Sequence, residues 1–176
     1  MKGSIHVIVQ NDRIKYEFSI RRNITIIKGD SATGKTSLID MIRDYNLQGT
    51  ESGVELFCAK KCAVIEGNLW KEQLSHVRQS IVFIDEGNRF MSSVDFARFI
   101  QGTDNYYVLV TREGLSALPY SIEEIYGIRS GGKYGGLTQT YHELYQIYKK
   151  NSESFPNVTK IVTEDSNAGF QFFEYN

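Results

Sequence analysis

The stretch that decides the predicted fold is ITIIKGDSATGKTSLIDMI, residues 24–42. Its largely apolar first four residues predict a strand that is buried on both faces. From Lys35 onward, apolar residues recur at helical spacing and predict a helix. Between the two, residues 29–36 match the pattern G-x-x-x-x-G-K-[ST] at every fixed position. The stretch therefore predicts a buried strand, a glycine-rich turn and a helix in direct succession.

The residue types of this motif suit a phosphate group. Glycines let the backbone wrap closely around an anion and present its N–H groups, and the free amides and dipole of the next helix face the same anion. Lys35 is predicted to reach the β- and γ-phosphates, and the Thr36 hydroxyl to coordinate Mg²⁺. We therefore expect ATP and Mg²⁺ to be bound by the following residues: Gly29, Asp30, Ser31, Ala32, Thr33, Gly34, Lys35, Thr36 and Ser37.

A second buried strand is predicted within SIVFIDEG, residues 80–87, and it ends in two acids and a glycine. In parallel sheets, ligands bind beyond the carboxyl ends of the strands. We expect Asp85 to meet the metal ion there and Glu86 to accept a proton. The alternative is a solvated turn after a strand. The occurrence of this pair some 50 residues after the motif at 29–36 favours the functional interpretation.

Together these segments resemble the Walker A and Walker B motifs of P-loop NTPases, and the resemblance covers most of residues 1–112. The acidic pair is similar to that of the branch with an added catalytic glutamate, as in ABC, SMC and AAA+ ATPases. The resemblance implies that Lys35 and Glu86 are catalytic and that Thr111 contacts the γ-phosphate or the attacking water. Arg112 follows Thr111 and is expected to neutralise transferred charge; the alternative is an ordinary surface arginine.

The pattern of strands and helices predicts an α/β protein. Two alternating runs within residues 4–20 predict an antiparallel hairpin, and the resemblance implies a three-layer P-loop NTPase fold with a mainly parallel sheet. We expect a single domain over residues 1–176, with 115–176 the least regular part. In that part, residues 138–150 suggest a helix. Residues 157–165 predict a last strand. The segment 160–176 that contains its end is similar to the first strand of a Toprim domain; the alternative is an edge strand that completes the sheet.

Composition limits the classes of function. The chain has 176 residues and a formal net charge of −1, so no global field attracts it to nucleic acid or anionic lipid. No apolar run reaches the 18 residues that a membrane span needs, and we expect a cytoplasmic location without membrane association. The two cysteines, in CAKKC at 58–62, lack the spacing and partners of a zinc site or a C-x-x-C redox pair. We interpret them as reduced thiols near a strand.

These observations favour a Mg²⁺-dependent ATPase that couples nucleotide binding or hydrolysis to a macromolecular partner, either protein or nucleic acid, or to a nucleotide-dependent homo-oligomer. Two alternatives remain open: a P-loop kinase or other transferase acting on a small acceptor, and a nucleotide-binding module with little turnover. A kinase needs an arginine-rich lid, and residues 115–150 contain only Arg129 besides three lysines. The preference for ATP over GTP rests on the family resemblance.

Overall fold

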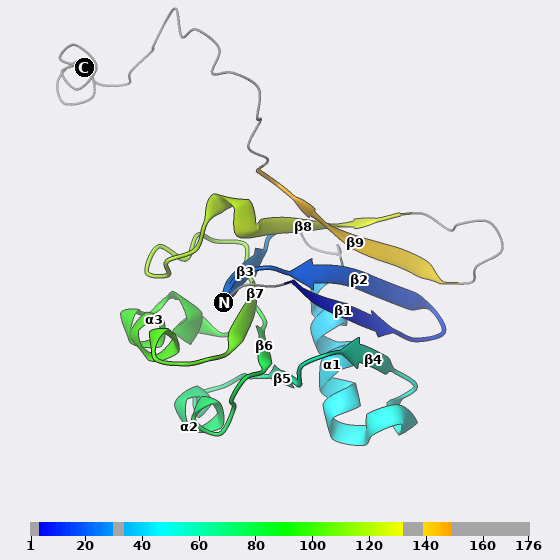
Figure 1. Ribbon diagram of the computed structural model, residues 1–176, viewed down its shortest axis with the longest axis horizontal. Coiled ribbons are helices and arrows are strands. Elements are labelled where there is room, and N and C mark those ends of the chain that lie inside the picture. Colours follow the sequence, from blue (N-terminus) through cyan, green and yellow to red (C-terminus); the bar gives the residue numbers. More distant parts are fainter. Residues whose placement is uncertain (1–3, 30–33, 132–138, 149–176) are drawn as a thin grey trace, which may run out of the picture.

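The computed structural model describes residues 4–29, 34–131 and 139–148, and these residues form one sheet of nine strands with the order β4-β1-β2-β9-β8-β3-β7-β6-β5 (Figure 1). The strands are β1 (Ile5–Gln10), β2 (Ile14–Ile20), β3 (Ile24–Ile27), β4 (Glu55–Cys58), β5 (Cys62–Val64), β6 (Ile81–Ile84), β7 (Tyr106–Val110), β8 (Ile125–Ser130) and β9 (Thr140–Gln146). The α-helices are α1 (Lys35–Gln48), α2 (Trp70–Ser75) and α3 (Val94–Gln101), and three short 3₁₀ helices cover Gly49–Ser52, Arg89–Ser92 and Ile122–Glu124.

One half of the sheet is built on the hairpin of β1 and β2. The two strands pair antiparallel from Ile5↔Ile20 to Gln10↔Lys15. The Asn11 side-chain oxygen accepts the N–H groups of Arg13 and Ile14, so the asparagine itself closes the turn. β4 adds antiparallel to β1, and β9 adds parallel to β2 and antiparallel to β8.

The other half of the sheet is parallel. β3 pairs with β7 and β8, and β6 pairs with β7 and β5, all in the parallel sense. Every residue of β3, β6 and β7 is buried. Strands covered on both faces have no solvated side, which explains why their sequences are largely apolar and do not alternate.

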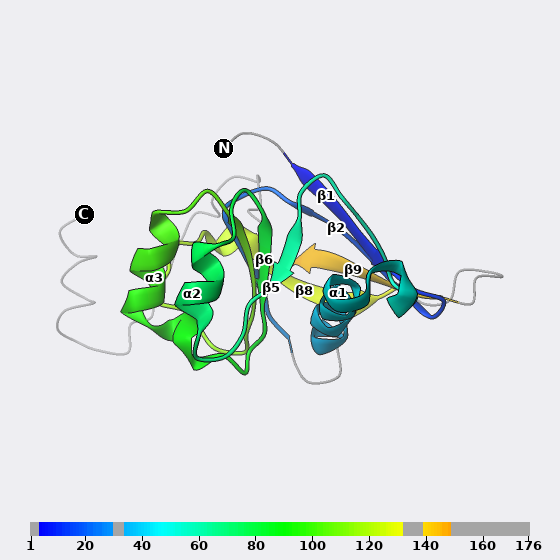
Figure 2. The same cartoon turned by 90° about the horizontal axis from the view of Figure 1, so that it is seen from below.

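Helices cover the two faces of the sheet unequally. The sheet curls around α1, which lies in the angle between the hairpin and the parallel strands (Figure 2). Leu38, Ile39 and Ile42 of α1 are fully buried against this concave face. On the other face, α2 and α3 enclose a second core that contains a cluster of aromatic rings around Trp70 and Phe96.

The architecture corrects two expectations. The three-layer P-loop NTPase fold with a mainly parallel sheet is wrong: the sheet is mixed, has nine strands, is curved nearly into a barrel and carries only three α-helices in the described residues. The predicted resemblance to the P-loop NTPase superfamily, including the ABC, SMC and AAA+ branch, fails with it. The strands that flank the hairpin make the sheet differ from the expected one: β4 pairs antiparallel with β1, and β9 pairs parallel with β2.

Residues 138–150 had suggested a helix, but residues 140–146 form β9. The tertiary pairing of β9 between β2 and β8 overrides a local pattern that suits a helix. The strand predicted at 157–165 lies outside the described residues. Among the described helices, none has the length and apolar character to cross a bilayer.

Candidate functional site

The carboxyl ends of β3, β6 and β7 lie at one edge of the sheet. The strands are parallel and in register, with Ile27 beside Val110 and Ile84 beside Leu109. Thr111 continues this ladder, and its N–H donates to the Ile27 carbonyl over 3.1 Å. The segments that begin at Gly29, Asp85 and Thr111 therefore leave the sheet from the same edge.

The glycine-lysine turn lies between β3 and the first turn of α1. Gly34 precedes the helix with φ 89° and ψ 6°, a left-handed conformation that glycine adopts without strain. Lys35 begins the helix and is only 5% exposed, and its Nζ donates to the Gly29 carbonyl over 2.6 Å. This bond closes the turn across its two ends. Asp30, Ser31, Ala32 and Thr33 lie outside the described residues.

Tyr16 of β2 is hydrogen-bonded to the end of this turn. The Tyr16 hydroxyl donates to the Gly34 carbonyl over 2.7 Å. The His142 ring of β9 stacks on Tyr16 with 4.8 Å between ring centroids. Burial raises the pKa of Tyr16 to about 12 and lowers the pKa of His142. Tyr16 therefore stays a neutral donor to the turn, next to an imidazole whose neutral form burial favours.

The predicted base and the predicted cation contact each other. The Arg112 guanidinium donates to both carboxylate oxygens of Glu86, with distances of 3.0 and 2.8 Å. Both side chains are partly exposed, so the energy of the pair is modest and its geometric effect is the larger one. Arg112 is held toward Glu86, which gives the arginine a defined direction that the sequence did not predict.

Asp85 and Thr111, two further residues predicted for the site, are hydrogen-bonded to the backbone of the turns that follow their strands. The Asp85 carboxylate accepts the N–H of Glu86 over 2.8 Å, and the Asp85 carbonyl accepts two bonds from Asn88. The Thr111 hydroxyl is bonded to the backbone of Glu113 through both its carbonyl and its N–H. Thr111 thereby fixes the bend that presents Arg112.

A cavity of about 650 Å³ opens beside the ion pair. Glu86 and Arg112 line it together with Thr111, and the 3₁₀ helix Arg89–Ser92 forms part of its wall. The cavity is large enough for a small ligand that reaches the Glu86 carboxylate.

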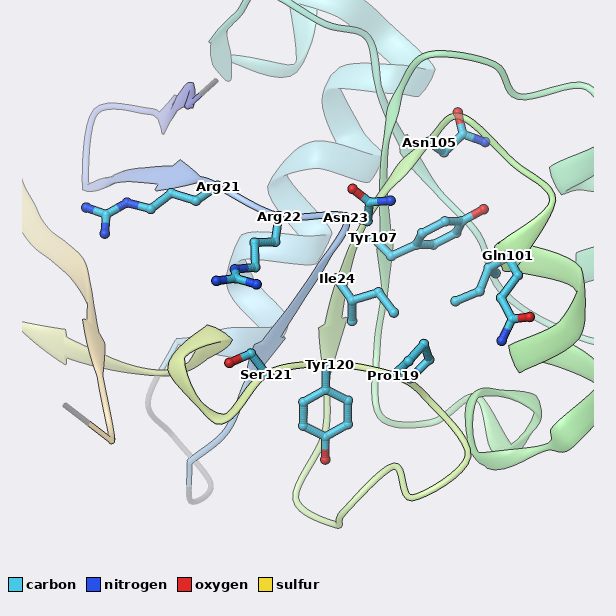
Figure 3. A pocket seen from close by; sticks show the side chains of 11 residues that line it. Arg21, Arg22, Asn23, Ile24, Gln101, Asn105, Tyr107, Pro119, Tyr120 and Ser121 are labelled. Carbon is cyan, nitrogen blue, oxygen red and sulfur yellow. The ribbon is translucent and has the colours of Figure 1, made fainter. Parts of the chain in front are cut away.

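A second cavity, of about 450 Å³, lies at the opposite edge of the parallel strands, around Ile24 and Tyr107 (Figure 3). Arg22 on its rim is paired with Glu123 and Glu124. The Arg21 side chain points away from the ring of Tyr107 in Figure 3. None of the residues predicted to bind nucleotide lines this cavity. Of its two arginines, Arg22 is paired with acidic side chains and Arg21 points away from Tyr107.

The two predicted metal ligands, Thr36 and Asp85, suit a Mg²⁺ ion that is also bound by the phosphates of a nucleotide. Thr36 is exposed on the first turn of α1, and Asp85 is half-buried at the end of β6. No group of three or more His, Cys, Asp or Glu side chains that could hold a metal occurs among the described residues. Mg²⁺ is commonly held by one or two protein oxygens together with phosphate oxygens, so this donor set fits a metal that arrives with a nucleotide.

Comparison with models of known protein families and with curated proteins finds no match. The expected family resemblance therefore has neither the fold nor a family match behind it, and the functional argument rests on the site alone.

The structure brings most of the predicted site residues to one edge of the sheet, and it adds two that the sequence analysis missed. Tyr16 and His142 touch the turn from β2 and β9. The alternation of β2 places Tyr16 on its buried face, a signal the sequence carried. The contact with His142 depends on a pairing between strands about 125 residues apart, which local sequence does not reveal.

Proposed function

We propose that the chain binds ATP with Mg²⁺ at residues 29–37 and hydrolyses it. The observation that supports this most is the common edge at which the glycine-lysine turn, the acidic pair and Arg112 leave parallel strands. A triphosphate bound over the first turn of α1 would have cationic, acidic and hydroxyl groups around it, positioned by α1 and by the ends of β6 and β7.

Each residue has one role in this proposal. Lys35 binds the phosphates, and its present bond to the Gly29 carbonyl holds it inside the turn until an anion competes for it. Thr36 and Asp85 supply oxygen ligands to Mg²⁺, which when bound withdraws charge from the phosphates. Tyr16 anchors the Gly34 carbonyl and so orients the backbone that follows.

Glu86 accepts a proton from the attacking water, but in the present state both of its oxygens are bonded to Arg112. Because Glu86 and Arg112 are bonded to each other, the proposed base and the proposed cation are both engaged, and the isolated chain hydrolyses ATP slowly. A macromolecular partner or a second copy of the chain accelerates turnover by separating the pair or by supplying another cation, an effect that reaches about 10³-fold or more in other phosphoryl-transfer enzymes.

Hydrolysis by the Glu86→Gln variant tests this proposal. The amide keeps the size of the side chain and one acceptor for Arg112 but removes the base, so nucleotide affinity persists while turnover falls by about 10²-fold or more. Glu113→Gln is the matched control, because Glu113 is another carboxylate on the same cavity. Wild-type turnover in Glu86→Gln would refute the role of Glu86.

A transferase that acts on a small acceptor is the second candidate. The cavity of about 650 Å³ favours it, because Glu86 could activate an acceptor hydroxyl there as well as water. With γ-labelled ATP, hydrolysis alone releases all of the label as inorganic phosphate. Transfer of the label to added metabolites, with the inorganic phosphate reduced in proportion, would instead support the transferase.

A further inference from the structure

The two cysteines of the chain lie at the two ends of the turn between β4 and β5. Cys58 ends β4 and Cys62 begins β5, with Ala59, Lys60 and Lys61 between them. Cys58 is half-buried and Cys62 is buried, and both are free thiols. A cavity of about 390 Å³ reaches them from the surface, and α1 contributes Tyr45 and Asn46 to its wall. A small reagent can therefore approach the pair.

The surroundings of Cys58 favour its thiolate. Both sulfurs are hydrogen-bonded to the backbone of Lys60: its N–H donates to the Cys58 sulfur over 3.4 Å, and the Cys62 thiol donates to its carbonyl over 3.8 Å. The charged groups around it are Lys60 and Lys61 of the turn and His6 of β1, all cationic when protonated. The interaction with the neighbouring Cys62 thiol, and then the N–H and charge of Lys60, outweigh burial and lower the pKa of Cys58 to about 6. The interaction with Cys58 and burial raise the pKa of Cys62.

We propose that Cys58 and Cys62 form a reversible oxidation site for hydroperoxides, in which Cys58 is oxidised first and Cys62 closes an intramolecular disulfide. An accessible thiolate beside a buried second thiol is the arrangement in which cysteines oxidise selectively. Because both sulfurs are bonded to the backbone of Lys60 and line the same cavity, a rearrangement of this turn is enough to join them.

The chemistry balances in two steps. The Cys58 thiolate attacks the terminal peroxide oxygen, an S–O bond forms, the O–O bond breaks, and the departing alkoxide or hydroxide takes a proton from water. Cys62 then loses its proton and attacks the Cys58 sulfur, so that the S–S bond forms while the S–O bond breaks and water leaves. Two thiols are oxidised by two electrons, and one hydroperoxide is reduced to an alcohol, or to water, plus one further water.

Intact-mass spectrometry of the full chain treated with hydrogen peroxide tests the site. The wild type loses two hydrogens and regains them with dithiothreitol. Cys58→Ser keeps its remaining thiol, whereas Cys62→Ala accumulates a sulfenic acid on Cys58 that dimedone traps. Unmodified thiols under conditions that oxidise free glutathione would overturn the proposal, and so would a disulfide that joins two chains.

The pH profile of alkylation by iodoacetamide gives an independent readout in the Cys62→Ala and wild-type chains. For the wild type, a pKa of about 6 means that the Cys58 rate rises less than about 1.2-fold from pH 7 to pH 8. A thiol with the ordinary pKa of about 8.5 rises about eightfold over that interval. Cys62→Ala shifts the profile toward the ordinary one. An ordinary profile in the wild-type chain would contradict the arrangement of the two thiols.

Discussion

Replacing Gly34 with alanine tests the support that Tyr16 gives to the turn before α1. A Cβ atom at this position would lie 2.8 Å from the Tyr16 hydroxyl, closer than side-chain carbons approach such atoms. The backbone is also left-handed, with φ 89°, which costs a residue with a Cβ about 1–2 kcal/mol. Displacing the tyrosine forfeits its bond to the Gly34 carbonyl, a contribution of about 1 kcal/mol.

The expected destabilisation for Gly34→Ala is therefore about 2–3 kcal/mol. Urea unfolding followed by circular dichroism measures it, and with a slope of about 2 kcal/mol/M the midpoint falls by about 1–1.5 M. Gly53→Ala is the matched control. Gly53 has φ 72° and ψ 7° in a similar left-handed conformation, but nothing lies within 4 Å of the position that a Cβ would take there. Its cost is the conformational one alone, about 1–2 kcal/mol.

A double-mutant cycle separates the contact from the strain. Tyr16→Phe removes the hydroxyl that the new Cβ would meet, so the cost of Gly34→Ala in that background falls toward the cost of Gly53→Ala. Equal midpoints for Gly34→Ala and Gly53→Ala, or strict additivity in the cycle, would show that Tyr16 does not press on the turn.

Three further predictions concern other parts of the molecule. Arg112→Ala frees the Glu86 carboxylate, so we expect the specific ATPase activity to depend differently on protein concentration in this variant and in the wild type. A dilution series of each protein measures this dependence. Identical series for the variant and the wild type would contradict the role of the ion pair. Trp70→Ala opens the aromatic cluster with Phe96 and should cost about 3–5 kcal/mol in urea unfolding, against about 0.5 kcal/mol or less for the exposed Leu47→Ala. Burial raises the pKa of Glu124, with Arg22 opposing it, so the folded state binds a proton more tightly than the unfolded state. The free energy of unfolding therefore falls as pH rises from the ordinary glutamate pKa through the raised one. Glu124→Gln should flatten that fall in unfolding curves taken at a series of pH values.

The local pattern of the sequence predicted the elements of the site well. Ile24–Ile27 form a buried strand and Lys35 begins a helix, as the motif and its flanks indicate. The hairpin of β1 and β2 follows from two alternating runs around Asn11. Alternation, apolar runs and turn residues are local signals, and here nothing in the tertiary structure overrides them.

The global fold could not be predicted in the same way. The motif led to an expected three-layer parallel architecture, whereas the number and sense of strand pairs depend on long-range partners. β9 is the clearest case, because a segment with a helix-like pattern becomes a strand between β2 and β8. The same long-range pairing brings His142 onto Tyr16.

Equilibrium binding of a fluorescent ATP analogue with Mg²⁺, in wild type and Lys35→Ala, tests the central proposal most directly. We expect saturable binding to the wild type that weakens about 10- to 100-fold in the variant, since a bond to a charged group contributes about 1.5–3 kcal/mol. Lys60→Ala is the control, because Lys60 is a lysine away from the turn, and circular dichroism verifies that Lys35→Ala remains folded. Affinity that is the same in the folded Lys35→Ala chain and in the wild type, or no binding to either, would contradict the proposed nucleotide site.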